Sequence, residues 1–163
     1  MNTTLIAFPA AALYIAGGFS TGLRLFGTED NWRPARNVGI GLGFAGLALH
    51  AILLYLDVFT SGGLNMSFFS AVSLAAWTIA ALLLISSLTK PVENLAILAL
   101  PMAALMILLE LRFPGSRMLS EDAGWALRLH VLTSMLAYSL LTLASAQAIL
   151  LAIQDHHLRS HHP

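Results

Sequence analysis

Five long stretches of this chain contain no Asp, Glu, Lys or Arg, and this lack of charge limits what the chain can fold into. The stretches are residues 1–23, 37–56, 58–89, 94–109 and 129–154. Overall, 58% of the residues are hydrophobic and 10% are charged, whereas a globular domain has about 25% charged residues. A soluble protein has too little polar surface to cover so many apolar side chains. The composition therefore predicts that this chain folds within a lipid membrane.

An α-helix needs about 20 mostly apolar residues to cross about 30 Å of hydrocarbon. Five segments meet this condition, and they predict an all-α fold, a polytopic integral membrane helical bundle with one transmembrane domain over residues 1–163. The fourth segment follows Pro91, which suits the first position of a helix, and contains Pro101, which predicts a bend. The predicted spans are Leu5–Leu23, Val38–Tyr55, Ser67–Ile85, Val92–Leu109 and Trp125–Ile153.

The basic residues near the ends of the spans predict the orientation of the bundle. Five spans place the two termini on opposite sides, with five basic residues on the side of the C-terminus and three on the other. Because cytoplasmic loops carry an excess of Lys and Arg, we predict the N-terminus outside and the C-terminus inside. Tyr55 and Trp125 then lie at the outer boundary, where aromatic side chains are enriched. The five basic residues are Arg24, Arg33, Arg36, Lys90 and Arg159, and the three are Arg112, Arg117 and Arg128.

The chain contains no cysteine, and its formal net charge is zero. The absence of cysteine excludes disulfides, thiolate metal sites and the C-x-x-C-H attachment of haem. The absence of net positive charge gives no indication of a nucleic-acid partner. A cofactor can still be held through histidine, of which the chain has six.

Two of the histidines, His50 and His130, lie inside predicted spans, where ionisable side chains are costly and functional by default. His50 comes seven residues before Asp57, and His130 comes five residues after Trp125. At about 1.5 Å per residue, both lie about 8–12 Å below the same outer surface. Two neutral imidazoles that face each other at one depth can bind the two axial positions of a haem iron. The alternative is a neutral histidine that forms hydrogen bonds between helices.

Small residues accompany each of these two histidines at helical spacing. Such smooth faces leave room for a flat macrocycle beside the ligand. Glycines at this spacing are nevertheless more often close-packing contacts between membrane helices, and we weight packing above a cofactor groove. The residues are Gly39, Gly43 and Gly46 beside His50, and Ser134 and Ala137 beside His130.

The remaining histidines are in the polar C-terminal tail. Four histidines within seven residues can bind a divalent metal, but the tail offers no ordered scaffold and no carboxylate except Asp155. We therefore interpret the tail as solvated. Its histidines are His156, His157, His161 and His162.

Several sequence runs resemble one known family. The second span ends in Leu49-His50-Ala51, and the run Gly63-Leu64-Asn65-Met66-Ser67 follows it. The third span contains Ser70-Ala71-Val72-Ser73-Leu74-Ala75-Ala76-Trp77, and the fifth opens with Leu129-His130-Val131-Leu132-Thr133-Ser134-Met135-Leu136-Ala137-Tyr138. Together these runs resemble the cytochrome c assembly protein family over nearly the whole chain. The closest branch is that of the bacterial inner-membrane proteins called YpjD, which are related to HemX and more distantly to CcsA and CcmC.

The resemblance implies a multi-pass bacterial inner-membrane protein of the haem-handling class, in which His50 and His130 match the intramembrane histidines of the family. It also implies partners among the proteins of cytochrome c maturation. The tryptophan-rich motif of the CcsA and CcmC branches is absent, because Trp32, Trp77 and Trp125 are isolated. This departure argues against direct delivery of haem to apocytochrome c. Members of the YpjD branch usually continue for about three more helices, so we expect the chain to match the N-terminal portion of that architecture.

We therefore predict a haem-binding assembly factor rather than an enzyme. It would hold haem b between His50 and His130 near the outer face, within membrane lipid, and would act in cytochrome c-type biogenesis. The redox chemistry would belong to the cofactor.

Two alternatives from other classes remain open. One is half of a small-molecule permease, favoured by Pro9 and Pro101, which can break helices at mid-depth, but weakened by the lack of acidic residues deep inside the spans. The other is a membrane scaffold subunit without a ligand, in which glycines only pack helices together. The glycines in question are Gly18, Gly22, Gly39 and Gly43.

Overall fold

Five long helices make up almost all of the described chain, which covers residues 3–27, 34–60, 63–65, 67–115, 118–119 and 124–160 of a computed structural model. All five are long and apolar enough to cross a membrane, so the predicted number of spans and the all-α fold are confirmed. Apolar helices form here because lipid offers no partner for the backbone, which must satisfy its own hydrogen bonds. The helices are α1 Thr3–Phe26, α2 Arg36–Val58, α3 Phe68–Thr89, α4 Ala96–Arg112 and α5 Trp125–Ser160.

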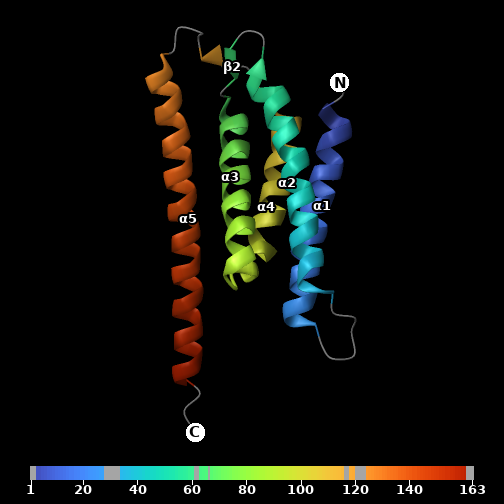
Figure 1. Cartoon of the computed structure of the whole chain (residues 1–163), viewed down its shortest axis with the longest axis vertical. Coiled ribbons are helices and arrows are strands. Elements are labelled where there is room, and N and C mark those ends of the chain that lie inside the picture. Colours follow the sequence, from blue (N-terminus) through green and yellow to red (C-terminus); the bar gives the residue numbers. More distant parts are fainter. Residues whose placement is uncertain are drawn as a thin grey trace.

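A small antiparallel sheet joins two of the connections at one end of the bundle. The segment after α2, which the sequence indicated as a turn, forms the hairpin strands β1 (Phe59–Thr60) and β2 (Gly63–Asn65). Leu64 of β2 then pairs with Leu119 of β3 (Met118–Leu119), in the connection between α4 and α5. The sheet therefore brings the C-terminal end of α2 and the start of α5 to the same end of the bundle (Figure 1).

The start of the fourth helix differs from the prediction. Pro91 was expected at its first position, but a 3₁₀ turn, Glu93–Leu95, precedes α4. The side chain of Asn94 accepts a hydrogen bond from the backbone N–H of Leu95 at 3.0 Å, and this local bond competes with regular helix. Pro101 lies inside α4, which continues through it.

The first four helices form the packed part of the molecule. α1 packs against α2 and α4, and α3 packs against α2 and α4. α5 packs against α3, so that α3 lies between α5 and α2 (Figure 1). The fully buried side chains at the centre include Tyr14, Leu83, Leu84 and Leu100.

Missing side chains on α2 allow it to approach α1 and α3 closely. A Cβ atom at Gly39 would lie 2.6 Å from the Oγ1 of Thr21, and one at Gly46 would lie 3.0 Å from a ring carbon of Tyr14. A Cβ atom at Gly43 would lie 2.8 Å from a methyl group of Leu84. These contacts are the close packing that small residues give to membrane helices, and they favour packing over a cofactor groove for this stripe.

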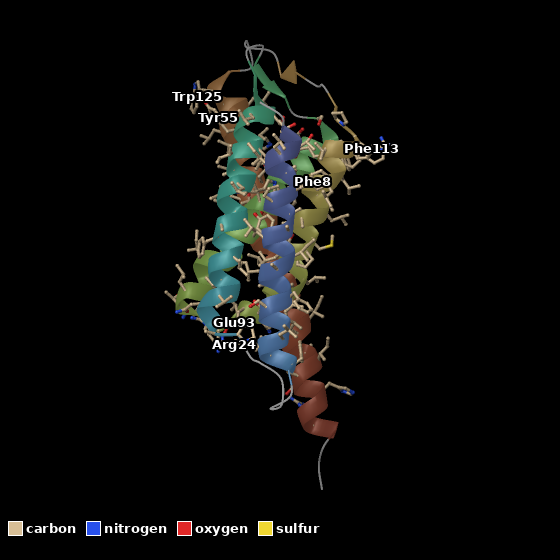
Figure 2. The ribbon with its side chains drawn as sticks, turned by 90° about the vertical axis from the view of Figure 1, so that its right-hand side faces the viewer. Phe8, Arg24, Tyr55, Glu93, Phe113 and Trp125 are labelled. Atoms are coloured by element: carbon tan, nitrogen blue, oxygen red, sulfur yellow. The ribbon has the colours of Figure 1, made fainter. Side chains whose placement is uncertain are left out.

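The two ends of the bundle differ in chemistry. Tyr55 and Trp125 lie at the end that carries the sheet, whereas Arg24 and Glu93 lie at the opposite end (Figure 2). The first residue of α1 and the last residue of α5 also lie at opposite ends (Figure 1). The N-out, C-in orientation remains a prediction. Of the residues used to derive it, Arg33 and Arg117 are outside the described residues, as are His161 and His162 of the tail.

Candidate functional site

The imidazole of His50 lies in the middle of the four packed helices and has no exposed surface. Its Nδ1 lies 3.3 Å from the hydroxyl of Tyr14, which comes from α1. Its Nε2 lies 3.0 Å from the hydroxyl of Ser73, which comes from α3. Tyr14 and Ser73 are themselves fully buried. Both ring nitrogens of His50 are therefore occupied, and the ring is fixed from two sides.

Glu110, from α4, extends this arrangement towards the end of the bundle that carries the sheet. Its carboxylate lies near the hydroxyls of Ser73 and Ser70. One carboxylate oxygen, Oε1, is buried without a hydrogen-bond partner among the described residues. Hydrogen bonds join Tyr14, His50 and Ser73, and Glu110 lies nearby. These four polar groups are here called the polar chain, and each of the four packed helices contributes one of them.

Local packing explains why the polar chain can form. Gly46 lies one turn before His50 on α2 and presents no side chain to the ring of Tyr14, which fits edge-on to the imidazole with ring centres 5.8 Å apart. Trp77, one turn after Ser73 on α3, donates its indole N–H to the backbone carbonyl of Leu47 at 3.0 Å. This bond fixes the position of α3 along α2 and hence of Ser73 against His50.

Along the bundle axis, His130 lies near the same end as His50, but its environment is different. It comes five residues after the start of α5, and His50 comes eight residues before the end of α2, which places both about 8–12 Å from the same end of the bundle. The side chain of His130 is exposed, whereas that of His50 is enclosed by α1 and α3. The structure thus places the two histidines at a similar depth and does not bring their rings together, because α3 lies between α2 and α5.

Two apolar grooves open on the sides of the bundle. One, of about 300 Å³, lies between α3, α4 and α5 and is lined by Ala76, Met102 and Leu143, among others. The other, of about 550 Å³, runs between α1 and α4 past Gly18 and Pro101. Neither groove is lined by His50 or His130.

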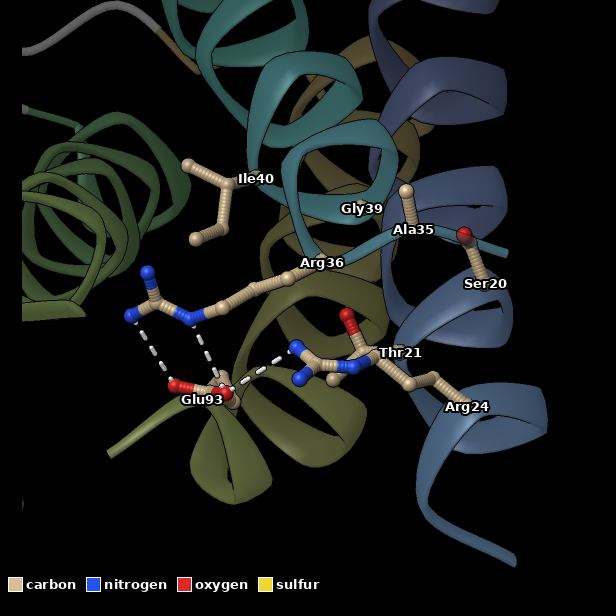
Figure 3. Close-up of a pocket in the computed structure, with 8 residues that line it drawn as sticks. All are labelled: Ser20, Thr21, Arg24, Ala35, Arg36, Gly39, Ile40 and Glu93. Carbon is tan, nitrogen blue, oxygen red and sulfur yellow. Dashed lines mark hydrogen bonds and ion pairs between the residues drawn. The ribbon is translucent and has the colours of Figure 1, made fainter. Parts of the chain in front are cut away.

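A second polar cluster lies at the opposite end of the bundle. The carboxylate of Glu93 forms ion pairs with Arg24 of α1 at 3.2 Å and with Arg36 of α2 at 3.1 Å (Figure 3). Arg36 also donates to the backbone carbonyl of Ser87, near the end of α3. The cluster therefore connects α1, α2, α3 and the 3₁₀ turn before α4.

Beside this cluster, Ser20 lines a small pocket of about 10 Å³ together with Arg24, Arg36 and Glu93 (Figure 3). The Ser20 hydroxyl is buried and has no hydrogen-bond partner among the described residues. A space of this size is about that of one water molecule.

The tail histidines form no metal site in the described part of the chain. His156 is exposed, and the side chain of His157 is outside the described residues. No group of three His, Cys, Asp or Glu residues that could hold a metal ion occurs among the residues that the structure describes.

The sequence pointed to His50 but not to its hydrogen-bond partners Tyr14 and Ser73, nor to the nearby Glu110. Glu110 was placed just beyond the fourth predicted span, whereas α4 extends to Arg112. A signal was present, since Ser70 and Ser73 are spaced three residues apart and therefore share one face of an apolar helix. That pair of hydroxyls marks the face of α3 that receives the carboxylate.

Comparison with known proteins gives a match to a protein family. A profile of the family described as Cytochrome C assembly protein matches residues 39–162, which include both intramembrane histidines. No curated protein and no solved structure gave a significant match. The matched segment begins at Gly39 and includes α3, α4 and α5.

Proposed function

The chain belongs to the cytochrome c assembly protein family, and from this membership we propose that its role in cytochrome c biogenesis is to hold haem b within the membrane. His50 and His130 are the proposed axial ligands. As a multi-pass membrane protein without a thiol, the chain has imidazole as its strongest iron-binding group. We further propose that it resides in the bacterial inner membrane and acts as an assembly factor rather than as a catalyst.

The environment of His50 is the observation that carries this proposal. Histidines that bind metals almost always form a hydrogen bond through the other ring nitrogen, which fixes the orientation of the ring. Tyr14 supplies such a partner at Nδ1. Nε2 points towards α3, and α5 packs on α3 from the side away from α2 (Figure 1). The donor group and its orientation therefore fit an iron ligand.

The present arrangement of helices is not yet that of a closed haem site. Ser73 occupies Nε2, and α3 lies between the two histidines. Binding by both histidines requires Ser73 to leave Nε2 and the contact between α3 and α5 to open. α5 is the helix best suited to this movement, because among its described side chains only that of Ser139 is buried. When bound, haem would supply the redox chemistry, while the chain orients the ligands and excludes water.

Haem titration of the purified chain in lipid nanodiscs tests the proposal. We expect the absorption spectrum of six-coordinate low-spin haem, as two imidazole ligands give. His50→Ala and His130→Ala should each abolish this spectrum, because each removes one ligand. His156→Ala, a change in the exposed tail, is the matched control and should leave the spectrum intact.

Because His50 is buried, His50→Ala can also disturb folding, and His130→Ala at an exposed position is the cleaner variant. If both variants keep the wild-type spectrum, or if the wild type binds no haem, the bis-histidine site is wrong. His50 then serves only to connect helices through its hydrogen bonds.

A further inference from the structure

The N-terminal end of α2 borders the small pocket at the end of the bundle away from the sheet (Figure 3). The first N–H groups of a helix have no partner within the helix and give this end a partial positive charge. The first turn of α2 contains no acidic residue, and Ala35, which precedes Arg36, has no side chain that could cap it. This helix end therefore favours a negative charge placed beside it.

The hydroxyl of Ser20 is a second feature of the pocket and is independent of the first. Ser20 of α1 lines the pocket, is only 8% exposed, and its Oγ has no hydrogen-bond partner among the described residues. The neighbouring Thr21 donates its own hydroxyl to the backbone carbonyl of Gly17 at 2.9 Å. Because an unpaired buried hydroxyl costs free energy, a ligand that accepts a hydrogen bond from Ser20 would be stabilised here.

The charged side chains around the pocket leave an excess of positive charge. Arg24 and Arg36 are both paired with Glu93, whose Oε1 accepts from both and whose Oε2 accepts from Arg36. Two guanidinium groups thus share one carboxylate, and one positive charge is not balanced within the cluster. A guanidinium group has five N–H donors, and Arg24 uses only its Nη1 among the described residues.

We propose that this pocket is a binding site for a small monovalent anion of the size of chloride. Ser20 donates a hydrogen bond to the anion, and the two arginines and the start of α2 supply the positive charge. The pocket volume of about 10 Å³ is that of one water-sized particle, so phosphate, sulfate and organic anions are too large. The bound anion connects the end of α1 to the start of α2 and to the turn that carries Glu93.

Thermal unfolding of the purified chain in a non-ionic detergent tests the site without haem. Sodium chloride is compared with sodium gluconate at equal concentrations, because gluconate gives the same ionic strength but does not fit the pocket. We expect a higher Tm in chloride, with a difference that rises and then saturates as the concentration increases. Circular dichroism measures both series.

Ser20→Ala is the decisive variant, because it removes the donor and only a hydroxyl that has no other partner among the described residues. The chloride concentration that gives half of the effect should rise about tenfold or more, since a hydrogen bond to a charged group is lost. Ser139→Ala is the matched control. It also removes a buried helix hydroxyl, which donates to the carbonyl of Met135 on α5, and it should keep the wild-type response to chloride.

Arg24→Gln separates charge from shape. It removes the excess positive charge, so the difference in Tm between chloride and gluconate should disappear, even though the lost ion pair lowers Tm in both salts. Arg159→Gln, at an exposed pair on α5, is its control and should keep the difference.

A direct measurement uses ³⁵Cl NMR, in which exchange with a bound site broadens the chloride signal. We expect broadening by the wild type that Ser20→Ala reduces. If the wild type neither broadens the signal nor responds differently to the two salts, the pocket holds water only and the proposal is wrong. A folded Ser20→Ala variant with the wild-type chloride response also overturns it. Neither result depends on the proposed haem function, which concerns the opposite end of the bundle.

Discussion

At the scale of single residues, the buried imidazole of His50 is stabilised by partners from two other helices. A buried polar group without a hydrogen bond costs free energy, and His50 avoids this cost through Tyr14 and Ser73. The same bonds give α1, α2 and α3 a specific common register. A histidine with this function contributes to the fold whether or not it also binds iron.

The Tyr14 hydroxyl should therefore contribute to stability. Tyr14→Phe keeps the ring and removes the bond to Nδ1, so we expect a loss of about 1 kcal/mol in the free energy of unfolding. Tyr138→Phe, at a side chain on α5 that is 71% exposed, is the matched control and should change it little. Equilibrium unfolding in mixed micelles measures both. Equal effects of the two variants would contradict the importance of the buried bond.

Glu93 is the second residue whose removal should be measurable. Glu93→Gln leaves Arg24 and Arg36 without their shared carboxylate. We expect the free energy of unfolding to fall by about 1 kcal/mol, and this difference from the wild type to become smaller at high salt. The control is Asp155→Asn, which removes an exposed pair with Arg159 on α5 and should cost less than about 0.5 kcal/mol. Equilibrium unfolding of both variants and of the wild type at two salt concentrations measures these differences. A Glu93 effect that is insensitive to salt would argue against an ion-pair origin.

The sequence could identify His50 but not the rest of its site. His50 is conspicuous because it is an ionisable residue within a charge-free stretch. Tyr14 and Ser73 become its partners only through the rotation of two other helices about their axes. In a soluble protein, the apolar face of a helix shows which side is turned towards the core. Lipid accepts apolar side chains on every face, so the hydropathy pattern of these helices does not show their rotation.

At the scale of the elements, the sequence predicts the helices well because each one is a charge-free segment of sufficient length. α5 begins at Trp125, as predicted, but continues to Ser160 rather than ending at Ile153, and the other boundaries shift by one to four residues. The 3₁₀ turn before α4 and the strand pairing of Leu64 with Leu119 were not predicted. Both depend on local or long-range hydrogen bonds rather than on hydropathy.

Two glycines on α2 test whether the close approach of α1 and α2 is needed. At Gly39 a methyl group would lie 2.6 Å from the Thr21 hydroxyl, whereas nothing lies within 4 Å of a methyl group at Gly41. We expect Gly39→Ala to destabilise the fold by about 1–3 kcal/mol through overpacking. Gly41→Ala should be neutral or stabilising by up to about 1 kcal/mol, because alanine favours helix.

The comparison is made by unfolding the two variants under the same conditions as the wild type. Both substitutions add the same methyl group to the same helix, so helix propensity cancels between them. If Gly39→Ala is as stable as Gly41→Ala, the tight contact between α1 and α2 is not required for the fold.

At the scale of the whole molecule, four helices pack around the polar chain and α5 lies on one side against α3. The number of spans followed from the sequence, but this arrangement did not, because helix-to-helix contacts in lipid depend on small residues and a few polar bonds. The depth comparison placed His50 and His130 at the same level and could not detect that α3 lies between them.

The orientation of the whole bundle is the prediction that reporter fusions test. Because the basic residues favour the side of the C-terminus, fusions after Arg36 and after Pro163 should both report the cytoplasm. A fusion within residues 115–122 should report the outer side. A cytoplasmic signal from the fusion within residues 115–122 would place the aromatic end of the bundle inside and would reverse the proposed location of the haem site.

The contacts of α1 also have a consequence for biosynthesis. α1 packs on α2, which follows it directly, and on α4, which is completed only at Arg112. At about 5–20 residues per second, the ribosome needs several seconds to extend the chain from the end of α2 to the end of α4. During this interval the surface of α1 that contacts α4 is still open to lipid or to the insertion machinery. In its first part, before α3 is inserted, the imidazole of His50 also lacks Ser73. The nascent chain thus passes through a two-helix stage in which Tyr14 alone can hold the histidine.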